Sequence, residues 1–203
     1  PLSAGLVVGH NRWATHGGIT ESNAHPHVSE HIALVHNGTI ENDDELRKEL
    51  IEQGYVFESE TDTEVVAHLI RSLYAEGSEH GLFEAVLRTI GKLQGAYAFV
   101  ACSLKEPETI VVARKSCPLL IGLGDGENFV ASDVRAVLSI TRRIIYLEND
   151  DCAEITRQGV RIVTKDGTEV KRKIHESSEL LDVHDKGPYA HFMQKEIYEQ
   201  PQA

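Results

Sequence analysis

Two short segments in the first forty residues carry side chains suited to recognising a small polar molecule. One reads Asn-Arg-Trp-Ala-Thr-His-Gly over residues 11–17, and the other reads His-Asn-Gly over residues 36–38. The planar guanidinium of Arg12 suits a carboxylate, which it can hold through two parallel hydrogen bonds. An amide beside a backbone N–H, as at Asn37 and Gly38, can donate two hydrogen bonds to one oxyanion. The pattern predicts a pocket for a small zwitterion at which negative charge develops.

Each of these residues also has a simpler interpretation. Asn-Gly after an apolar run is most often a tight turn, and the residues alone favour that interpretation for Asn37 and Gly38. Asp62 is interpreted first as a carboxylate in the first turn of a helix, where the helix dipole favours it, and second as the partner of a substrate ammonium. A lone arginine such as Arg12 more often forms a surface ion pair. Trp13, the single tryptophan, is either a packing anchor or a lid over a ligand.

Four histidines lie close to these segments and make a metal site conceivable. They are His25, His27, His31 and His36. No cysteine lies beside them and no HExxH pattern occurs, so the zinc signal is weak. The chain also lacks a Walker A loop, a Rossmann glycine fingerprint and a Gly-x-Ser-x-Gly elbow. The sequence therefore predicts a site without a metal or cofactor.

Composition narrows the class of protein. The chain has 203 residues, of which 41% are hydrophobic and 26% charged, as expected of one globular domain. Its net charge of −12 argues against nucleic acid or an anionic membrane as partner, and the basic run 171–173 is interpreted as a solvated strand end. No apolar stretch is long enough to span a bilayer. Three widely spaced cysteines, Cys102, Cys117 and Cys152, suit a reducing, cytoplasmic compartment, and Cys102 is expected to be buried and inert.

The hydrophobic pattern predicts helices early in the chain and strands later. Apolar runs predict strands at 6–10 and 32–36, separated by a polar loop. Helical spacing then predicts helices at 43–53, at 61–77 behind a Thr-x-x-Glu capping box, and at 82–93. Further strands are expected at 96–103, 109–113, 119–123, 129–131, 143–147, 160–164 and 169–174, with a helical turn at 134–138, a hairpin turn at 165–168 and a tail helix at 188–199. This order predicts an α+β domain with largely antiparallel sheets.

Several motifs together resemble a known family. They are residues 12–17, 23–27, 35–38 and 59–64, followed by Gly122 to Gly126, Ala131 to Asp133 and the tail Met193 to Pro201. In order and spacing they are similar to the glutaminase domains of the glucosamine-6-phosphate synthase family, over essentially the whole chain. The resemblance implies an N-terminal-nucleophile hydrolase fold, a four-layer αββα sandwich of antiparallel sheets between helical layers.

The resemblance also implies a reaction and a set of roles. In this family a cysteine at the mature N-terminus attacks the side-chain amide of L-glutamine, with its own α-amine as base, and ammonia leaves. The implied roles are Arg12 for the α-carboxylate, Thr15 and His16 for the lining beside it, Asp62 for the α-ammonium, Asn37 and Gly38 for the oxyanion hole, Trp13 for a loop closing over the substrate, and His25 for support. These roles replace the turn interpretation of Asn37 and the helix-dipole interpretation of Asp62.

The chain departs from the family pattern at its two ends. It begins at Pro1, so the resemblance implies a partial glutaminase domain over 1–203, incomplete at the N-terminus and without the nucleophile. Residues 189–203 would begin the connection to an absent isomerase domain that binds fructose 6-phosphate, in an enzyme expected to be a homo-oligomer. The chain alone is expected to be inactive and to expose unpaired strand edges. The alternatives are the glutaminase domain of a purine or asparagine amidotransferase, a non-catalytic glutamine-binding module, and a metal-binding protein.

Overall fold

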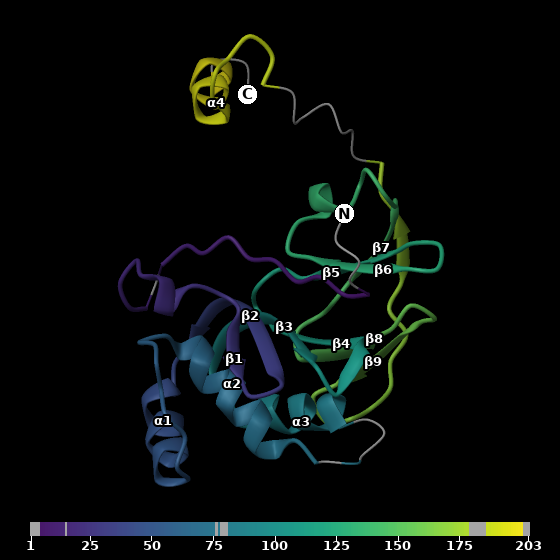
Figure 1. Cartoon of the computed structure of the whole chain (residues 1–203). Helices are drawn as coiled ribbons and strands as arrows, with labels where there is room; N and C mark the ends of the chain where they lie inside the picture. The colour runs from purple at the N-terminus through teal and green to yellow at the C-terminus, as the bar shows by residue number, and fades with distance from the viewer. Residues whose placement is uncertain (1–4, 15, 76, 78–80, 179–185, 201–203) are drawn as a thin grey trace.

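The computed structural model describes residues 5–14, 16–75, 77, 81–178 and 186–200. These residues form helices, two 3₁₀ turns (Glu21–Asn23 and Val134–Ala136) and strands in two sheets (Figure 1). The helices are α1 (Asp43–Glu52), α2 (Asp62–Leu73), α3 (Gly81–Ile90) and α4 (Phe192–Glu199). The strands are β1 (His27–Ser29), β2 (Ile32–Ile40), β3 (Gly95–Ser103), β4 (Glu106–Lys115), β5 (Leu120–Leu123), β6 (Asn128–Ala131), β7 (Arg143–Tyr146), β8 (Asp151–Ile155), β9 (Val160–Thr164) and β10 (Ile174–Glu176).

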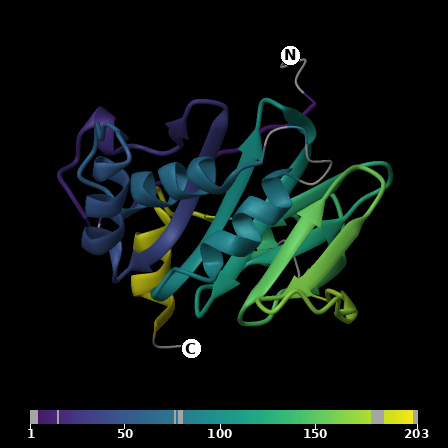
Figure 2. The ribbon, with the colours of Figure 1, turned by 90° about the horizontal axis from the view of Figure 1, so that it is seen from below.

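A six-stranded antiparallel sheet forms the centre of the molecule. Its order is β1-β2-β3-β4-β8-β9, and the second sheet has the order β10-β7-β5-β6. Helices α2 and α3 cover one face of the larger sheet, as Figure 2 shows, and the smaller sheet lies on its other side. The predicted α+β class with antiparallel sheets is confirmed. Strands β1 and β8 were not predicted, because each is short and lacks a long apolar run.

Strand β3 separates two apolar cores. Because side chains alternate along a strand, Tyr97 and Phe99 join the core beneath the helices, whereas Ala98 faces the smaller sheet. The first core includes Leu69 of α2, and the second includes Ile121 of β5. The two layers against the central sheet thus hold it from both sides and fix the position of β2, which carries part of the site.

Helix α2 begins at the predicted cap. The Thr61 hydroxyl accepts a hydrogen bond from the Glu64 backbone N–H at 3.2 Å. The reciprocal half of the capping box is wrong, because the Glu64 carboxylate instead accepts from the backbone N–H groups of Glu58 at 2.8 Å and Ser59 at 2.7 Å. Glu64 therefore ties the preceding loop to the helix and holds the first turn of α2 in place.

The predicted hairpin strand at 169–174 is wrong. A turn does form, with the Thr164 N–H donating to the Thr168 carbonyl at 2.9 Å. Pairing then stops at a single bridge between Val163 and Glu169, and the chain crosses to the smaller sheet, where β10 pairs with β7. The turn signal was therefore correct, but it does not determine which sheet the next strand joins.

Arg172 holds this crossing segment. Its guanidinium donates to both carboxylate oxygens of Asp151, at 3.0 and 2.7 Å, and forms an ion pair with Glu148 at 2.8 Å. Asp151 is fully buried, whereas Glu148 is exposed. The interpretation of the run 171–173 as a solvated strand end is wrong at its central residue, which is the counter-ion of a buried carboxylate.

The segment before the first 3₁₀ turn lies outside both sheets. Strand 6–10 was predicted, but the structure has no strand there, and Val7 is 67% exposed. An apolar run becomes a strand only where another strand offers hydrogen-bond partners, and no described strand does so here. Near the other end, α4 confirms most of the predicted tail helix and buries none of its side chains. Among the residues described, no helix is long and apolar enough to cross a membrane.

Candidate functional site

A pocket of about 280 Å³ lies where three segments of the chain meet. Its wall comes from residues 10–13 together with His16 and His25, its floor from residues 36–39 of β2, and its far side from residues 61–63 at the start of α2. The described site residues predicted from the sequence all line this one pocket. Thr15 lies outside the described residues.

Asn37 and Gly38 lie inside a strand and not in a turn. They pair with Ala98 and Tyr97 of β3, and β2 continues to Ile40. The turn interpretation is therefore wrong, because β3 supplies hydrogen-bond partners along the whole stretch. Both residues are exposed at the pocket although their neighbours in the strand are largely buried.

Glycine is the only residue type that fits at position 38. Its φ of 122° lies in the region that residues with a side chain rarely adopt. A Cβ atom there would lie 2.1 Å from the carbonyl oxygen of Ala96. The close approach of β2 to β3 thus depends on the missing side chain and places the backbone of Gly38 at the pocket surface.

Arg12 reaches the pocket from the loop that precedes the first 3₁₀ turn. Its guanidinium donates to the carbonyl oxygen of Gly18 at 2.9 Å and also to that of His16. These bonds turn the loop back on itself and leave other guanidinium N–H donors for a ligand. His16 lines the pocket beside Arg12, and Trp13, at 89% exposed, extends from the rim into solvent.

A small polar network attaches this loop to the segment before α2. The Glu60 carboxylate accepts from the Gly18 N–H at 3.1 Å and from the Asn23 side-chain amide at 3.2 Å. The same amide donates to the Gly18 carbonyl, and its oxygen accepts from the Glu60 N–H at 3.0 Å. These hydrogen bonds lower the pKa of the Glu60 carboxyl. The network positions Arg12 relative to the first turn of α2.

Asp62 is a buried carboxylate without a cationic side chain among the described residues that contact it. One oxygen accepts from the Ile40 N–H at 2.9 Å, and the same oxygen lies 4.0 Å from His36 Nδ1. Its side chain is 5% exposed, yet it lines the pocket. Both interpretations of Asp62 are consistent with its position, because it is the first residue of α2 and also faces the ligand space.

Three histidines around the pocket are joined by hydrogen bonds. His10 and His25 contact through their Nδ1 atoms at 2.9 Å, and His25 and His36 both contact the Thr63 hydroxyl at 3.0 Å. Burial lowers the pKa of His25 to about 3, with a further contribution from His10. Burial also lowers the pKa of His36 to about 4, against the opposing influence of Asp62. His25 and His36 are therefore neutral near pH 7.

This burial predicts a pH dependence of stability. The folded-state pKa of His36 lies below the unfolded value of 6.5, so the unfolded chain takes up the proton first as pH falls. Above pH 6.5 His36 is neutral in both the folded and the unfolded chain, and its contribution to stability is complete. Below that pH the free energy of unfolding falls toward pH 4 by about 1.4 kcal/mol per pH unit for each such proton. Denaturant unfolding between pH 7 and 4.5 measures this slope. An unchanged slope in His36→Gln would contradict it.

The histidines predicted as possible metal ligands have other partners. His27 Nε2 contacts the Thr61 hydroxyl at 3.0 Å, and His31 packs against Tyr74. Within the described ranges, no group of three or more His, Cys, Asp or Glu side chains is arranged to hold a metal ion.

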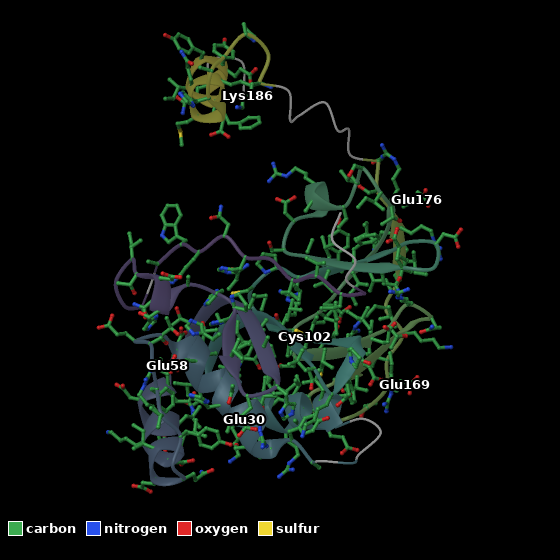
Figure 3. The ribbon with its side chains drawn as sticks, in the orientation of Figure 1. Glu30, Glu58, Cys102, Glu169, Glu176 and Lys186 are labelled. Carbon is green, nitrogen blue, oxygen red and sulfur yellow. The ribbon has the colours of Figure 1, made fainter. Side chains whose placement is uncertain are left out.

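The three cysteines lie away from the pocket lining. Cys102 is in β3, within the central sheet (Figure 3), where its thiol contacts the Ala33 carbonyl at 3.8 Å. Burial raises the pKa of the Cys102, Cys117 and Cys152 thiols. A raised pKa removes the thiolate, so none of the three is suited to nucleophilic attack.

Among the polar pocket residues to which sequence reasoning gave no role, His10 and Thr63 form hydrogen-bond contacts with other pocket residues. His10 contacts the Asn37 side-chain oxygen at 2.8 Å, and Thr63 contacts two histidines. His10 was not predicted because it ends an apolar run interpreted as a strand. Thr63 was not predicted because a threonine in the first turn of a helix is common, and no local pattern shows which residues its side chain will contact.

Comparison with family models identifies one domain. A model described as a glutamine amidotransferase domain matches residues 10–139. The match includes each of the three segments that line the pocket.

Curated relatives resemble the chain over its whole length. The chain is 57% identical over 203 residues to the glutamine–fructose-6-phosphate aminotransferases (isomerizing) of Shigella flexneri and of Escherichia coli K12. It spans about a third of the length of these relatives, 33% in each case. Among solved structures, the phosphoribosylpyrophosphate amidotransferase of Bacillus subtilis, complexed with ADP and GMP, has a TM-score of 0.62 and 29% identity, covering 77% of this chain and 34% of that one.

Proposed function

The chain belongs to the family of glutamine amidotransferase domains, and from this premise we propose that its pocket binds L-glutamine for hydrolysis of the side-chain amide. The observation that carries the proposal is the pairing of one cation and one buried anion across a small pocket. Arg12 and Asp62 line it together, while His25 and His36 are neutral. An α-amino acid presents the complementary charges, a carboxylate and an ammonium.

Asp62 supports this assignment most directly. A buried carboxylate is costly unless a positive charge or hydrogen bonds compensate it. Asp62 has one close backbone donor, from Ile40, and it lines the pocket. The ammonium of glutamine would complete this set, while Arg12 would hold the α-carboxylate with His16 beside it. Thr15 is assigned to the same end of the pocket by resemblance, Trp13 to the closing loop, and His25 to support.

Asn37 and Gly38 are the proposed oxyanion hole. They lie side by side in β2, and both are exposed at the pocket floor. The amide N–H of Asn37 and the backbone N–H of Gly38 would donate to the oxygen that gains negative charge when the amide carbon is attacked. Removing one such donor typically costs about 10²- to 10³-fold in kcat.

The attacking thiolate is not one of the three described cysteines. None lines the pocket, and burial raises the pKa of each thiol. By resemblance to the family, the nucleophile is a cysteine at a mature N-terminus, whose α-amine acts as base. Hydrolysis is therefore proposed for the complete protein, in which residues 1–203 form part of the glutaminase domain.

The activity of the complete protein is proposed from the relatives' name. In this reaction, ammonia from glutamine passes to a part of the protein that isomerises and aminates fructose 6-phosphate, giving glucosamine 6-phosphate. Residues 189–203 would lead toward that part, which suits α4 because it buries none of its side chains. The complete protein would be a homo-oligomer. Its free cysteines suit a cytoplasmic location.

Ligand analogues test the binding mode. Arg12→Lys keeps the charge but loses the fork that binds a carboxylate through two bonds, so the affinity for L-glutamine should fall about tenfold. The affinity for 4-aminobutanamide, which is glutamine without its α-carboxylate, should change little. Calorimetric titration of both ligands into both proteins gives the coupling energy between guanidinium and carboxylate.

Arg157→Lys is the matched control, because Arg157 is an exposed arginine outside this pocket. It should leave both affinities unchanged. Equal losses for the two ligands in Arg12→Lys would show that Arg12 only shapes the loop.

A non-catalytic glutamine-binding module is the second candidate, because the described pocket holds the binding groups without a cysteine. Glutamate release by the complete protein separates the two. Turnover supports the glutaminase. Glutamine binding without turnover supports the module.

A further inference from the structure

A chain of hydrogen bonds links the side chains of two neighbouring residues of β2, His36 and Asn37. It starts at His36 Nδ1, which contacts Thr63 Oγ1 at 3.0 Å, and Thr63 Oγ1 contacts His25 Nε2 at 3.0 Å. It continues from His25 Nδ1 to His10 Nδ1 at 2.9 Å and ends where His10 Nε2 meets Asn37 Oδ1 at 2.8 Å. Because successive side chains of a strand point to opposite faces, the chain passes around the strand from its buried to its exposed side.

Along such a chain, a neutral imidazole makes the donor-to-acceptor direction of one hydrogen bond determine that of the next. Each has one N–H donor and one acceptor nitrogen, so every bond in the chain determines the next. Burial keeps His25 and His36 neutral near pH 7, since their pKa values are lowered to about 3 and about 4. The hydrogen bonds can therefore run in two directions, and the group at one end selects between them.

Asp62 selects the direction at the buried end. Its carboxylate oxygen lies 4.0 Å from His36 Nδ1, which favours an N–H at that nitrogen over a lone pair. His36 then donates to Thr63, Thr63 donates to His25 Nε2, His25 Nδ1 donates to His10, and His10 Nε2 donates to Asn37 Oδ1. Each atom has the role that the observed contacts require.

The reverse direction carries two penalties. The lone pair of His36 Nδ1 would face the Asp62 carboxylate. The proton would then be on His36 Nε2, which is buried and has no hydrogen-bond partner among the described residues. A buried unpaired N–H is unfavourable, because the group has lost its hydrogen bond to water without a replacement. The competing contact from the Thr63 hydroxyl to Asp62 Oδ1 is 3.5 Å long, too long to displace the 3.0 Å bond to His25.

We propose that Asp62, through His36, Thr63, His25 and His10, fixes the side-chain amide of Asn37 with its oxygen on His10 and its N–H₂ group toward the pocket. Thr63, His25 and His10 are then positioning residues that keep a donor, and not an acceptor, at the oxyanion site. An amide free to rotate would present its oxygen to the oxyanion part of the time. The value of the fixed orientation for catalysis rests on the proposed function, whereas the orientation itself does not.

The orientation is tested directly by nitrogen-15 NMR of the histidine rings in the complete protein. The expected result is a protonated Nδ1 on His25 and His36 and a protonated Nε2 on His10. A protonated Nε2 on His36, or a protonated Nδ1 on His10, would overturn the proposal. This measurement needs no glutamine, so it stands even if the proposed function fails.

The effect on catalysis is tested at Thr63, where one substitution interrupts the chain. Thr63→Val removes the hydroxyl at nearly constant shape, and Thr63→Ser retains it. Losing a donor outright costs 10²–10³ in kcat, so losing only its orientation should lower kcat on the order of tenfold, with KM for glutamine nearly unchanged. Thr63→Ser should recover most of kcat.

Thermal unfolding of both variants identifies a general loss of structure, which would lower the apparent kcat by reducing the folded fraction. An unchanged kcat in a folded Thr63→Val protein would overturn the positioning role. If the wild-type protein has no glutaminase activity, the proposed function fails, and the NMR result alone decides the orientation.

Discussion

Gly38→Ala is expected to lower the rate of glutamine hydrolysis strongly and to destabilise the fold. A φ of 122° costs a residue with a side chain about 1–3 kcal/mol, and the new Cβ would lie 2.1 Å from the Ala96 carbonyl oxygen. Relief of that overlap requires β2 to move away from β3, which costs about 1–3 kcal/mol more. The same movement displaces the donors at Asn37 and Gly38, so residual kcat should fall by about 10²-fold or more.

Gly126→Ala is the matched control for this variant. Gly126 has a φ of 71°, but no atom lies within 4 Å of the position of an added Cβ. Its cost should be about 1–2 kcal/mol, arising from the backbone conformation alone, with activity retained. Denaturant unfolding and glutamate release measure both variants. If the two substitutions cost the same, the close approach of the strands contributes nothing.

Arg172→Met is expected to lower stability by about 3–5 kcal/mol, because it leaves the buried Asp151 carboxylate without its counter-ion. For a domain of this size the melting temperature should fall by about 10 °C. The penalty comes from a stranded charge, so the double variant Arg172→Met with Asp151→Leu should recover most of it.

Arg157→Met provides the comparison for an exposed ion pair. Arg157 and Glu108 lie 3.4 Å apart with both side chains largely exposed, and the loss should stay within about 0.5 kcal/mol. Thermal and denaturant unfolding of the three variants gives these values. A double variant as unstable as Arg172→Met would show that the guanidinium stabilises through packing instead of charge.

The helices and most of the antiparallel strands could be predicted because their signals are local. Helical spacing and the Thr61 cap located α2, and apolar runs located β2 and β3. The failures are those in which a partner elsewhere decides the outcome. Residues 6–10 have strand composition but no described strand to pair with. Residues 169–174 leave β9 after one bridge, and Arg172 in this segment contacts Asp151.

The site could be predicted from composition only as a pocket for a zwitterion. Its residue roles came from resemblance, because the local signal for Asn37 and Gly38 favours a turn, whereas pairing with β3 keeps them in a strand. The contacts of Thr63 and His10 join segments far apart in sequence. Such contacts depend on the packing of α2 against β2, which no single stretch of sequence contains.

The pocket is made of two parts that differ in how they are held. Its floor belongs to hydrogen-bonded secondary structure, whereas the wall that carries His10 and Arg12 lies outside both sheets and is held mainly by side-chain bonds. Opening the wall therefore requires far less free energy than unfolding the domain. A ligand that contacts both Arg12 and Asp62 would hold the wall against the floor. Ligand binding would therefore favour the closed wall, and the closed wall would favour ligand binding.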